Sequence, residues 1–362
     1  MTVTQRTDRA ERLVSLLPEV HVDLMLVTDL INVRYLTGYT GSNGLAVVGP
    51  RTRAFITDFR YVQQAAEQVD RAFDRHEAPL ELREMIKDVL PQGPLSLGFE
   101  ETHLTVHAHR QLRQTLPDRV ELVGIEGVVE RLRAVKEPDE VARIGEAAKL
   151  ADDAFDAVLG GGLIGRTERE VAFALASEMR ARGAARPSFD AIVAGGPHGA
   201  LPHASPRDVE IGAGELVVID WGGELDGYCS DCTRTLAAGD VGAREREIYD
   251  IVLAAQLAGL GAVRAGAEAA RVDSAARDII EAAGYGGQFG HGLGHGVGLD
   301  IHEAPRLSQR SDAVLTADNV VTVEPGVYLP DQFGVRIEDL AVVTPDGSEV
   351  LTSVPKELTV VG

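Results

Sequence analysis

The sequence is poor in cysteine, aromatic residues and long apolar runs. Among 362 residues there are two cysteines and one tryptophan, and aromatic side chains make up 5%. Two cysteines are too few for the disulfide framework of small secreted domains. No run reaches the roughly 18 apolar residues that a transmembrane helix needs, so no membrane partner is expected. Residues 1–20 lack the apolar core of a signal peptide, so we expect a cytoplasmic protein.

Basic charge is also scarce. Acidic residues outnumber basic ones 56 to 35, which gives a formal net charge of -21. Phosphate binding needs a basic surface, so this balance argues against nucleic acid as a partner. It predicts a well-solvated acidic surface. The alternative is that some of the carboxylates are gathered to hold cations. The hydrophobic fraction of 44% is typical of a folded protein with a sizeable core, and the length favours two domains.

The two cysteines form a C-x-x-C pair, Cys229 and Cys232. In a cytoplasmic protein this spacing occurs in redox dithiols and in one half of a zinc site. Residues 228–235 are predicted to form a strand, and side chains three residues apart on a strand point to opposite faces. We therefore expect two small buried side chains. A dithiol oxidoreductase is the alternative, which a thiol assay with and without reductant would test.

The first 125 residues alternate short apolar runs with helical patterns, which is typical of an α/β domain. The predicted strands are Leu24–Val27, Leu45–Val48 and Ala54–Thr57. The predicted helices are Phe59–Val69 and Leu80–Leu90. The pattern then changes to a long amphipathic run, which places a boundary between residues 125 and 136. We assign residues 1–125 to an N-terminal domain and residues 126–362 to a second domain.

The second domain shows the same order of elements twice. A helix starts at Pro138, and a second one begins at the capping box of Thr167 and Glu170, before a strand near residue 191. Further along, helices predicted at residues 244–263 and 269–283 precede glycine-rich strands. This order predicts two similar halves that pack around a shared site.

An apolar strand, E-L-V-V-I-D-W at residues 215–221, carries Asp220 near its end. Glycines and a second strand through Thr235 follow, so we expect a hairpin centred near residue 225. This register would make Asp220 and Asp231 cross-strand neighbours, with side chains about 5 Å apart on one face. Two ionised carboxylates at that separation repel, and they need a shared proton or a cation between them. The alternative is two solvated surface acids.

A second motif, G-H-G-L-G-H-G-V-G-L-D-I-H-E, spans residues 290–303. His291, His295 and His302 stand among five glycines, which is not the pattern of a hydrophobic core. Glycines let the backbone approach closely and leave imidazole nitrogens accessible, as a ligand or a proton-transfer group requires. The motif therefore indicates functional histidines on a strand or loop.

Two further apolar strands each end in a carboxylate, Glu324 and Glu338. An acid there is costly to bury unless it is paired or bound to a metal. With Asp220, Asp231 and His295 they form an oxygen-rich set that suits two divalent ions. The expected metal is Mn²⁺, and Co²⁺ and Zn²⁺ are the alternatives. Bridging carboxylates hold such ions about 3.5 to 4 Å apart, close enough to share one water molecule.

The segments IDWGGELDGYCSDCTRT, GHGLGHGVGLDIHE, TVEPGVY and GVRIED resemble the motifs of the pita-bread metallopeptidases, particularly the aminopeptidase P and prolidase branch. The resemblance covers residues 130–362, and the N-terminal part is similar to a creatinase-type domain. It implies an α/β (α+β) fold, with a creatinase-like α/β domain followed by a pita-bread catalytic domain of pseudo-twofold α-α-β halves. It also implies a homodimer, with the N-terminal domain at the contact.

The resemblance implies how the metal set is shared. Asp231 and Glu338 would bridge the two ions, Asp220 would complete one of them, and His295 and Glu324 would complete the other. Glu324 would also act as general base and acid, because a carboxylate beside the attacking water can accept its proton and pass it on.

Further residues take implied roles around that set. His203 matches a histidine near the leaving group, and His291 and His302 match two histidines that line the substrate pocket. His302 would donate a hydrogen bond to the carbonyl oxygen as charge develops on it. Arg336 matches an arginine that orients Asp220. His198 matches no position of the motif and is expected to be a loop histidine.

The implied reaction is hydrolysis of an Xaa-Pro peptide bond by a hydroxide that bridges the two ions. A dipeptidase must recognise the carboxylate of a C-terminal proline, and Arg306 resembles an arginine that does so in some prolidases. The alternative for Arg306 is an exposed surface arginine without a role. An aminopeptidase P, which takes longer peptides with proline at the second position, is the alternative. A creatinase-like hydrolase and an inactive peptide-binding relative are disfavoured, because all five ligand positions are filled.

Overall fold

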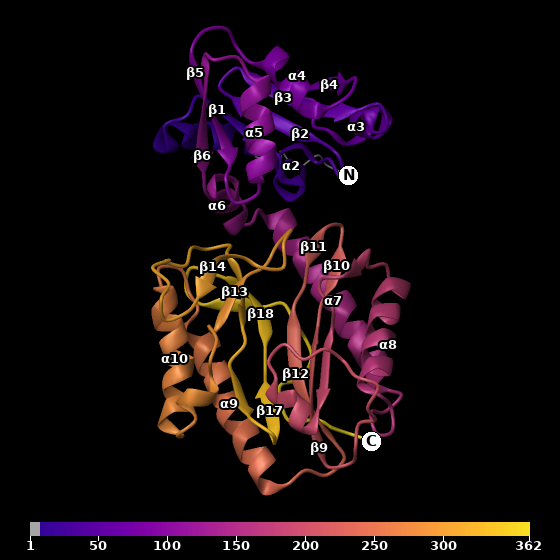
Figure 1. The fold of residues 1–362 in the computed structure, drawn as a ribbon. Helices are drawn as coiled ribbons and strands as arrows, with labels where there is room; N and C mark the ends of the chain where they lie inside the picture. Colours follow the sequence, from indigo (N-terminus) through magenta and orange to yellow (C-terminus); the bar gives the residue numbers. More distant parts are fainter. Residues whose placement is uncertain (1–7) are drawn as a thin grey trace. The chain divides into compact units, whose positions relative to one another are not determined.

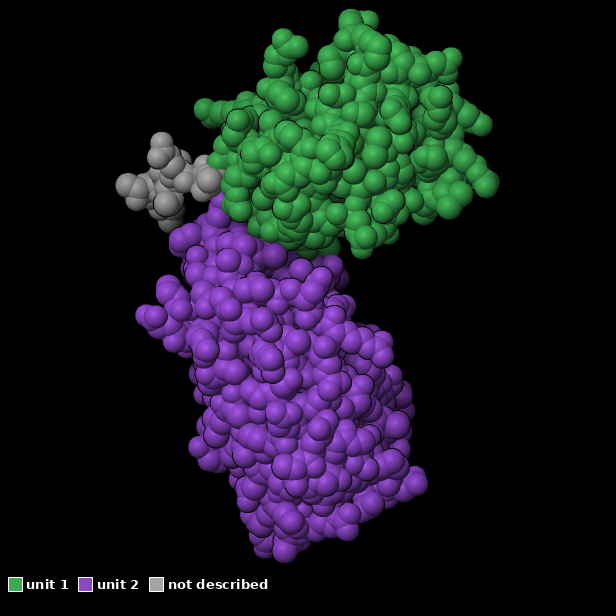
Figure 2. All heavy atoms as spheres, turned by 90° about the vertical axis from the view of Figure 1, so that its left-hand side faces the viewer, with its two compact units in different colours: residues 1–133 green, residues 134–362 purple. Residues whose placement is uncertain are grey.

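The computed structural model describes residues 8–362 and divides into two compact units, residues 1–133 and 134–362 (Figure 2). The domain boundary after residue 125 stays a prediction, because one short helix, α6 (Val128–Ala134), lies between the two positions. Of the part of the chain that is described, no helix is both long and apolar enough to cross a lipid bilayer.

The first unit is an α/β domain built on a six-stranded sheet with the order β4-β3-β2-β1-β5-β6 (Figure 1). Its helices are α1 (Arg9–Leu16), η1 (Leu17–Val20), α2 (Leu30–Thr37), α3 (Val62–Gln68), α4 (Leu82–Val89), α5 (Val106–Thr115) and α6. Its strands are β1 (Leu24–Val27), β2 (Leu45–Gly49), β3 (Thr52–Asp58), β4 (Asp74–Ala78), β5 (Leu95–Glu100) and β6 (Val120–Ile125). The central strands are buried on both faces, which is why they read as continuous apolar runs.

The helix predicted from Phe59 begins three residues later, at Val62. Asp58 accepts hydrogen bonds from the backbone N–H and the Nε of Arg60, at 3.0 and 2.9 Å. These bonds hold a turn after β3, because an aspartate that binds the backbone two residues ahead competes with helix formation.

The second unit contains the repeated order of elements that the sequence predicts. Its helices are α7 (Pro138–Leu159), α8 (Glu168–Ala181), η2 (Gly196–Ala200), α9 (Ala243–Ala262), α10 (Ala269–Ala282) and η3 (Gly286–Gln288). Its strands are β7 (Arg186–Pro187), β8 (Ile192–Gly195), β9 (Glu215–Trp221), β10 (Gly223–Leu225), β11 (Tyr228–Cys229), β12 (Cys232–Ala238), β13 (Gly294–Gly296), β14 (Glu303–Leu307), β15 (Val320–Val323), β16 (Gly326–Leu329), β17 (Phe333–Arg336), β18 (Asp339–Val343), β19 (Ser348–Val350) and β20 (Val360–Val361).

Each half of this unit packs a helix pair against its own sheet. Helices α7 and α8 share a hydrophobic core with β9 and β12, and α9 and α10 share another with the strands around β15 and β18. In Figure 1 the two helix pairs flank the strands from opposite sides. The predicted fold, an α/β domain followed by α-α-β halves, is therefore confirmed, and the inner strands of both halves face a shared centre.

The register of the β9–β12 hairpin differs from the sequence prediction. Asp220 pairs with Thr233, not with Asp231, which directly precedes β12. The reason is the turn: Asp226 and Gly227 both have positive φ, 48° and 79°, and form the two-residue loop between β10 and β11. This loop lies one residue beyond the expected centre, so every cross-strand partner shifts by two. A shift of two keeps Asp220 and Asp231 on the same face.

Candidate metal centre and cavity

The five acidic and histidine positions singled out in the sequence lie at strand ends of the second unit. Asp220 is the penultimate residue of β9, and Asp231 precedes β12. His295 is the middle residue of β13, and Glu324 follows β15. Glu338 lies between β17 and β18. Both halves of the unit therefore contribute to one place.

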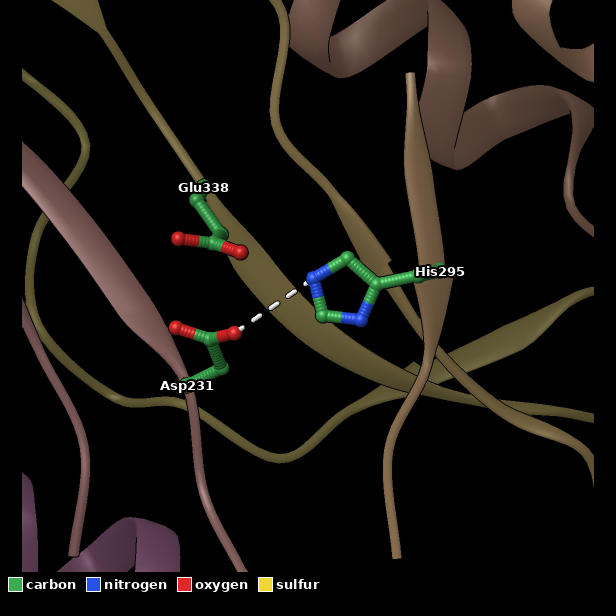
Figure 3. A group of neighbouring side chains, drawn as sticks. All are labelled: Asp231, His295 and Glu338. Carbon is green, nitrogen blue, oxygen red and sulfur yellow. Dashed lines mark ion pairs between the residues drawn. The ribbon is translucent and has the colours of Figure 1, made fainter. Parts of the chain in front are cut away.

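Three of these side chains form a buried cluster able to hold a metal ion (Figure 3). Asp231, His295 and Glu338 are 5%, 7% and 2% exposed, and their ligand atoms all lie within 4.8 Å of one another. His295 Nε2 is 3.6 Å from Asp231 Oδ2 and 3.4 Å from Glu324 Oε1. Figure 3 shows the ring edge of His295 pointing at both carboxylates.

The protonation of His295 fits a cation in this cluster. Its Nδ1 lies 3.0 Å from the carbonyl oxygen of Gly296, which can only accept, so the hydrogen is assigned to Nδ1. Burial lowers the pKa of His295 to about 4, so the ring is neutral near pH 7. The lone pair of Nε2 then faces carboxylate oxygens, an arrangement that a cation between them stabilises.

The carboxylates fit the same interpretation. Burial, followed by the charge of Glu338, raises the pKa of Asp231, and burial followed by Glu324 raises that of Glu338. Burial raises the pKa of Glu324 to about 7. Asp220 Oδ1 is buried and accepts no hydrogen bond from the described residues. Clustered acids that are costly to ionise, with a free buried oxygen, are the donor set that divalent ions neutralise.

Arg336 connects Asp220 with the histidine side of the site. Its Nη2 lies 2.7 Å from Asp220 Oδ2, and its Nη1 donates to the hydroxyl of Tyr328 at 2.9 Å. The Tyr328 hydroxyl is 3.0 Å from Nε2 of His291, whose Nδ1 faces the carbonyl oxygen of Gly292. Burial lowers the pKa of His291 to about 4, so its Nε2 can accept from the tyrosine. These hydrogen bonds fix the orientation of the Asp220 carboxylate, the Tyr328 hydroxyl and the His291 ring.

A cavity of about 420 Å³ opens onto the cluster. Its wall contains every site residue predicted from the sequence, and the lining is formed by Phe189, Asp190, Ile192, Pro202, His203, Ala204, Ser205, Pro206, Asp220, Asp231, His291, Gly292, Gly294, His295, Ile301, His302, Arg306, Glu324, Arg336 and Glu338. The rings of His295 and His302 lie 4.5 Å apart. A pocket of this size with convergent polar groups is what a small peptide substrate needs.

Sequence reasoning missed the residues that hold the ligands in place. Thr233 donates to Glu338 Oε2 at 2.7 Å and accepts from Arg336 Nε at 3.0 Å. Thr322 lies 3.2 Å from Glu324 Oε1 and accepts from the backbone N–H of His295 at 3.0 Å. The strand period was the available signal, because each threonine lies two residues from a singled-out acid and therefore on the same face.

The two cysteines lie in different strands, Cys229 in β11 and Cys232 at the start of β12. Both are buried and free. Burial raises the pKa of Cys229 to about 12 and that of Cys232 well above its usual value. Neither thiol is therefore ionised near neutral pH, which agrees with two buried structural side chains.

Comparison with known proteins decides the family. Residues 142–345 match the model of metallopeptidase family M24, and residues 9–135 match the creatinase/prolidase N-terminal domain. The chain belongs to metallopeptidase family M24. As a member of this family it is a metal-dependent peptidase, and the creatinase-type N-terminal domain expected from the sequence is confirmed.

Relatives align over almost the entire chain. The Xaa-Pro dipeptidase of Pyrococcus furiosus is 37% identical over 97% of this chain and 99% of its own. The solved structure of an Xaa-Pro dipeptidase from Bacillus anthracis has a TM-score of 0.94 at 40% identity and covers 98% and 99% of the two chains. An X-Pro aminopeptidase from Thermotoga maritima has a TM-score of 0.90 at 35% identity, covering 98% and 100%. The M24 fold thus accommodates both named activities.

Proposed function

We propose that this M24 peptidase is an Xaa-Pro dipeptidase that works with two divalent ions, Mn²⁺ in the first place. The observation that carries the proposal is the cavity wall, where the five candidate ligands meet His203, His291, His302 and Arg306. The names of the relatives from Pyrococcus furiosus and Bacillus anthracis support the substrate class.

In this proposal Asp231 and Glu338 would hold both ions, Asp220 would complete one site, and His295 and Glu324 would complete the other. When bound, the ions supply Lewis acidity, which polarises a scissile carbonyl and makes water more acidic. The fit rests on the neutral His295 facing carboxylates, on the raised pKa values of those carboxylates and on the Asp220 oxygen, which has no hydrogen-bond partner among residues 8–362.

The side chains around the candidate ligands can divide the remaining chemistry. Glu324 lies at the cavity wall, where it would take the proton of the attacking water and deliver it to the imide nitrogen of proline. His302 would donate to the carbonyl oxygen as negative charge develops. His203 and His291 would line the proline side, and Arg336 would keep Asp220 oriented at 2.7 Å.

Arg306 is the residue that favours a dipeptidase. It lies on β14 at the wall of the cavity that Ile301 and His302 also line. A guanidinium there can bind the carboxylate of a C-terminal proline through two parallel hydrogen bonds. The alternative is an Xaa-Pro aminopeptidase, the activity named for the relative from Thermotoga maritima.

One experiment separates these readings. The protein is stripped with a chelator, single metals are restored, and turnover of an Xaa-Pro dipeptide is compared with that of an Xaa-Pro-Yaa tripeptide. We expect activity only with metal, highest with Mn²⁺ and greater on the dipeptide. Preference for the tripeptide would establish the aminopeptidase, and no turnover of either substrate with any metal would reject the peptidase.

Arg306→Lys sharpens the dipeptidase test. The lysine keeps the charge but loses the bidentate geometry, so KM for the dipeptide should rise about tenfold while tripeptide kinetics stay unchanged. We also propose a homodimer, as the family resemblance implies, and analytical ultracentrifugation of the full chain would test it.

A further inference from the structure

One wall of the cavity is a segment with little regular structure, residues 195–207. It leaves the end of β8, passes through the short η2 and carries His203 to the cavity. Ala204, Ser205 and Pro206 line the same cavity. A loop of this length is ordinarily mobile, so something outside it must fix its course.

A single buried carboxylate contacts both ends of this segment. Glu168, the first residue of α8, is 1% exposed. Its Oε1 accepts from the backbone N–H of Gly195 at 3.0 Å, where the segment begins. Its Oε2 accepts from the backbone N–H of Arg207 at 2.9 Å, where the segment ends. Two positions twelve residues apart are thus joined through one side chain.

Two side chains of the same segment add to these bonds. The Arg207 guanidinium donates to Glu168 through Nε at 3.1 Å and Nη2 at 3.0 Å. Nδ1 of His198 lies 3.0 and 2.9 Å from the two carboxylate oxygens. This contact gives a place to His198, which matches no position of the family motif. Every bond from the segment to Glu168 has a charged acceptor, the stronger kind of hydrogen bond.

The centre of the segment is bound to Arg336, which also contacts the candidate metal ligand Asp220. Arg336 donates from Nη1 to the carbonyl oxygen of Pro202 at 3.0 Å, and its Nη2 binds Asp220. His203 directly follows Pro202, so its backbone is fixed relative to Asp220. The ends are held by Glu168 and the middle by Arg336, which leaves the histidine little freedom to move.

The position of Glu168 suits a permanently ionised carboxylate. It is the first residue after the N-cap Thr167, where the helix dipole favours negative charge. Burial acts to raise the pKa of Glu168, but the hydrogen bonds from Arg207 and Gly195 outweigh it and lower the pKa. The charge that holds the segment is therefore present throughout the neutral range.

We propose that Glu168 is a positioning residue of the peptidase, which fixes both ends of the 195–207 segment and thereby the place of His203 beside the candidate metal ligands. The inference rests on the proposed function for its catalytic consequence. Its structural part, the fastening of the segment, stands on the contacts alone.

The second half of the unit contains a comparable arrangement. On α10, Asp273 pairs with Arg277 at 2.7 Å and accepts from the backbone N–H of Leu293 at 3.0 Å. Arg277 donates to the carbonyl oxygens of Phe289 and His291, at 2.8 and 2.7 Å. In each half, an acid on the second helix holds the loop that carries a cavity histidine.

The first test is hydrogen exchange on the full chain, with and without Mn²⁺, for the wild type, Glu168→Gln and Glu170→Gln. Glu170 is the matched control, because its carboxylate caps the same helix by accepting from Thr167 N–H at 2.8 Å and is not bonded to the segment. We expect peptides from residues 195–207 to exchange about tenfold faster in E168Q and unchanged in E170Q. Equal exchange of this segment in both variants would overturn the inference.

The second test is a double-mutant cycle with His203→Ala, read as kcat on an Xaa-Pro dipeptide. If Glu168 acts through His203, E168Q should lower kcat about tenfold in the wild-type background and less than about twofold in the H203A background. Fully additive losses would show a purely structural role and overturn the positioning role. Metal content, expected to be unchanged in E168Q, separates this effect from loss of the ions.

The outcomes distinguish this inference from the proposed function. A wild type without metal-dependent turnover rejects the peptidase, while the exchange measurement still decides whether Glu168 holds the segment. If E168Q does not fold, Arg207→Ala removes two of the bonds at a half-exposed side chain. It should show the same pattern of exchange and kcat at reduced size, and wild-type exchange in R207A would count against the inference.

Discussion

His295 is the residue on which the metal proposal depends most directly. Nε2 of the neutral His295 ring lies 3.6 Å from Asp231 Oδ2 and 3.4 Å from Glu324 Oε1. The ring nitrogen and both carboxylate oxygens are hydrogen-bond acceptors that face one another. Without a cation these groups must share protons, and the raised pKa values of the carboxylates express that requirement. The electrostatics of the cluster and its proposed affinity for divalent ions are therefore two aspects of one arrangement.

At this scale we expect the two proposed bridging carboxylates to be essential for the ion pair. Asp231→Ala and Glu338→Ala should each reduce bound Mn²⁺ from two ions per chain to none, as measured by elemental analysis after dialysis. Asp190→Asn is the matched control, an exposed acid at the wall of the same cavity that is outside the cluster. Two retained ions in D231A or E338A would contradict the bridging role.

The raised pKa of Glu324 predicts how the free energy of unfolding of the metal-free protein depends on pH. Burial raises its pKa from about 4.5 to about 7 on folding, so the folded state binds a proton that the unfolded chain releases. The associated stabilisation is full below about pH 4.5 and is lost as the pH rises through about 7. The test compares the free energy of unfolding of the wild type with that of Glu324→Gln, both freed of metal by a chelator. The wild-type value minus the variant value should fall from pH 5 to pH 8. A constant difference would contradict the raised pKa, and excess Mn²⁺ should suppress the decline in the wild type.

At the scale of elements, β13 lies between β14 and β15 with almost no space for side chains. A Cβ at Gly294 would collide with the carbonyl oxygen of Thr322, and one at Gly296 with that of Ala304. The glycines of the histidine-rich motif thus serve backbone approach between three strands, and they bring His295 between the two halves.

Gly294→Ala should therefore lower the free energy of unfolding by about 1 to 3 kcal/mol and weaken Mn²⁺ binding, since the strand must move to admit the methyl group. Gly290→Ala is the control from the same motif, because a Cβ there meets nothing within 4 Å. Chemical denaturation and metal titration of both variants provide the measurement. Equal stability of G294A and G290A would show that β13 can shift freely.

A buried ion pair holds the loop that carries His302. Lys136 Nζ lies 3.1 Å from Glu303 Oε2, with the two side chains 1% and 5% exposed, and Glu303 Oε1 accepts from Asp300 N–H at 3.0 Å. Removing one partner of a buried pair leaves the other charge uncompensated.

We expect Lys136→Met to lower the free energy of unfolding by about 3 to 5 kcal/mol and to reduce kcat through misplacement of His302. Lys149→Met is the control, because its ion pair with Asp153 is exposed and should contribute less than about 1 kcal/mol. Denaturation curves of the two variants give the comparison. Similar losses in both would show that burial of the Lys136 pair adds no stability.

The sequence predicted those elements whose signals are local. Strand β9 and helix α7 were located because apolar patterns and a proline at the helix start mark their limits. The hairpin register was missed because it depended on which residues adopt positive φ, and the Asp226–Gly227 pair was one of several glycine-containing choices. The bonds of Glu168 to Arg207 and of Arg336 to Pro202 join residues 39 and 134 positions apart, and no local pattern encodes such contacts.

At the scale of the whole molecule, the chain consists of two units with separate cores. Side chains of helix α6 bind the first unit, so this unit extends to residue 133. Its Arg133 donates to Asn32 at 2.8 Å, and Asn32 donates to Glu130 at 2.6 Å. The predicted boundary after residue 125 leaves α6 with the second domain, whereas the compact first unit includes most of it.

Two fragments test the boundary. Residues 8–133 should unfold cooperatively, as followed by circular dichroism during denaturation. Residues 8–125 should be less stable, because Asn32 loses the side chains of Glu130 and Arg133 while it stays buried. Equal stability of the two fragments would support the boundary after residue 125.

The single tryptophan of the chain gives the second unit a spectroscopic label of its own. Trp221 is fully buried beside Asp220, stacks on Phe155 with ring centroids 3.8 Å apart and donates from Nε1 to the carbonyl oxygen of Ala151 at 3.0 Å. Tryptophan fluorescence therefore reports on β9 and its packing against α7, and the first unit contributes no tryptophan emission. Unfolding of the catalytic unit can be followed by emission in the unmodified protein, at the strand that presents Asp220 to the cavity.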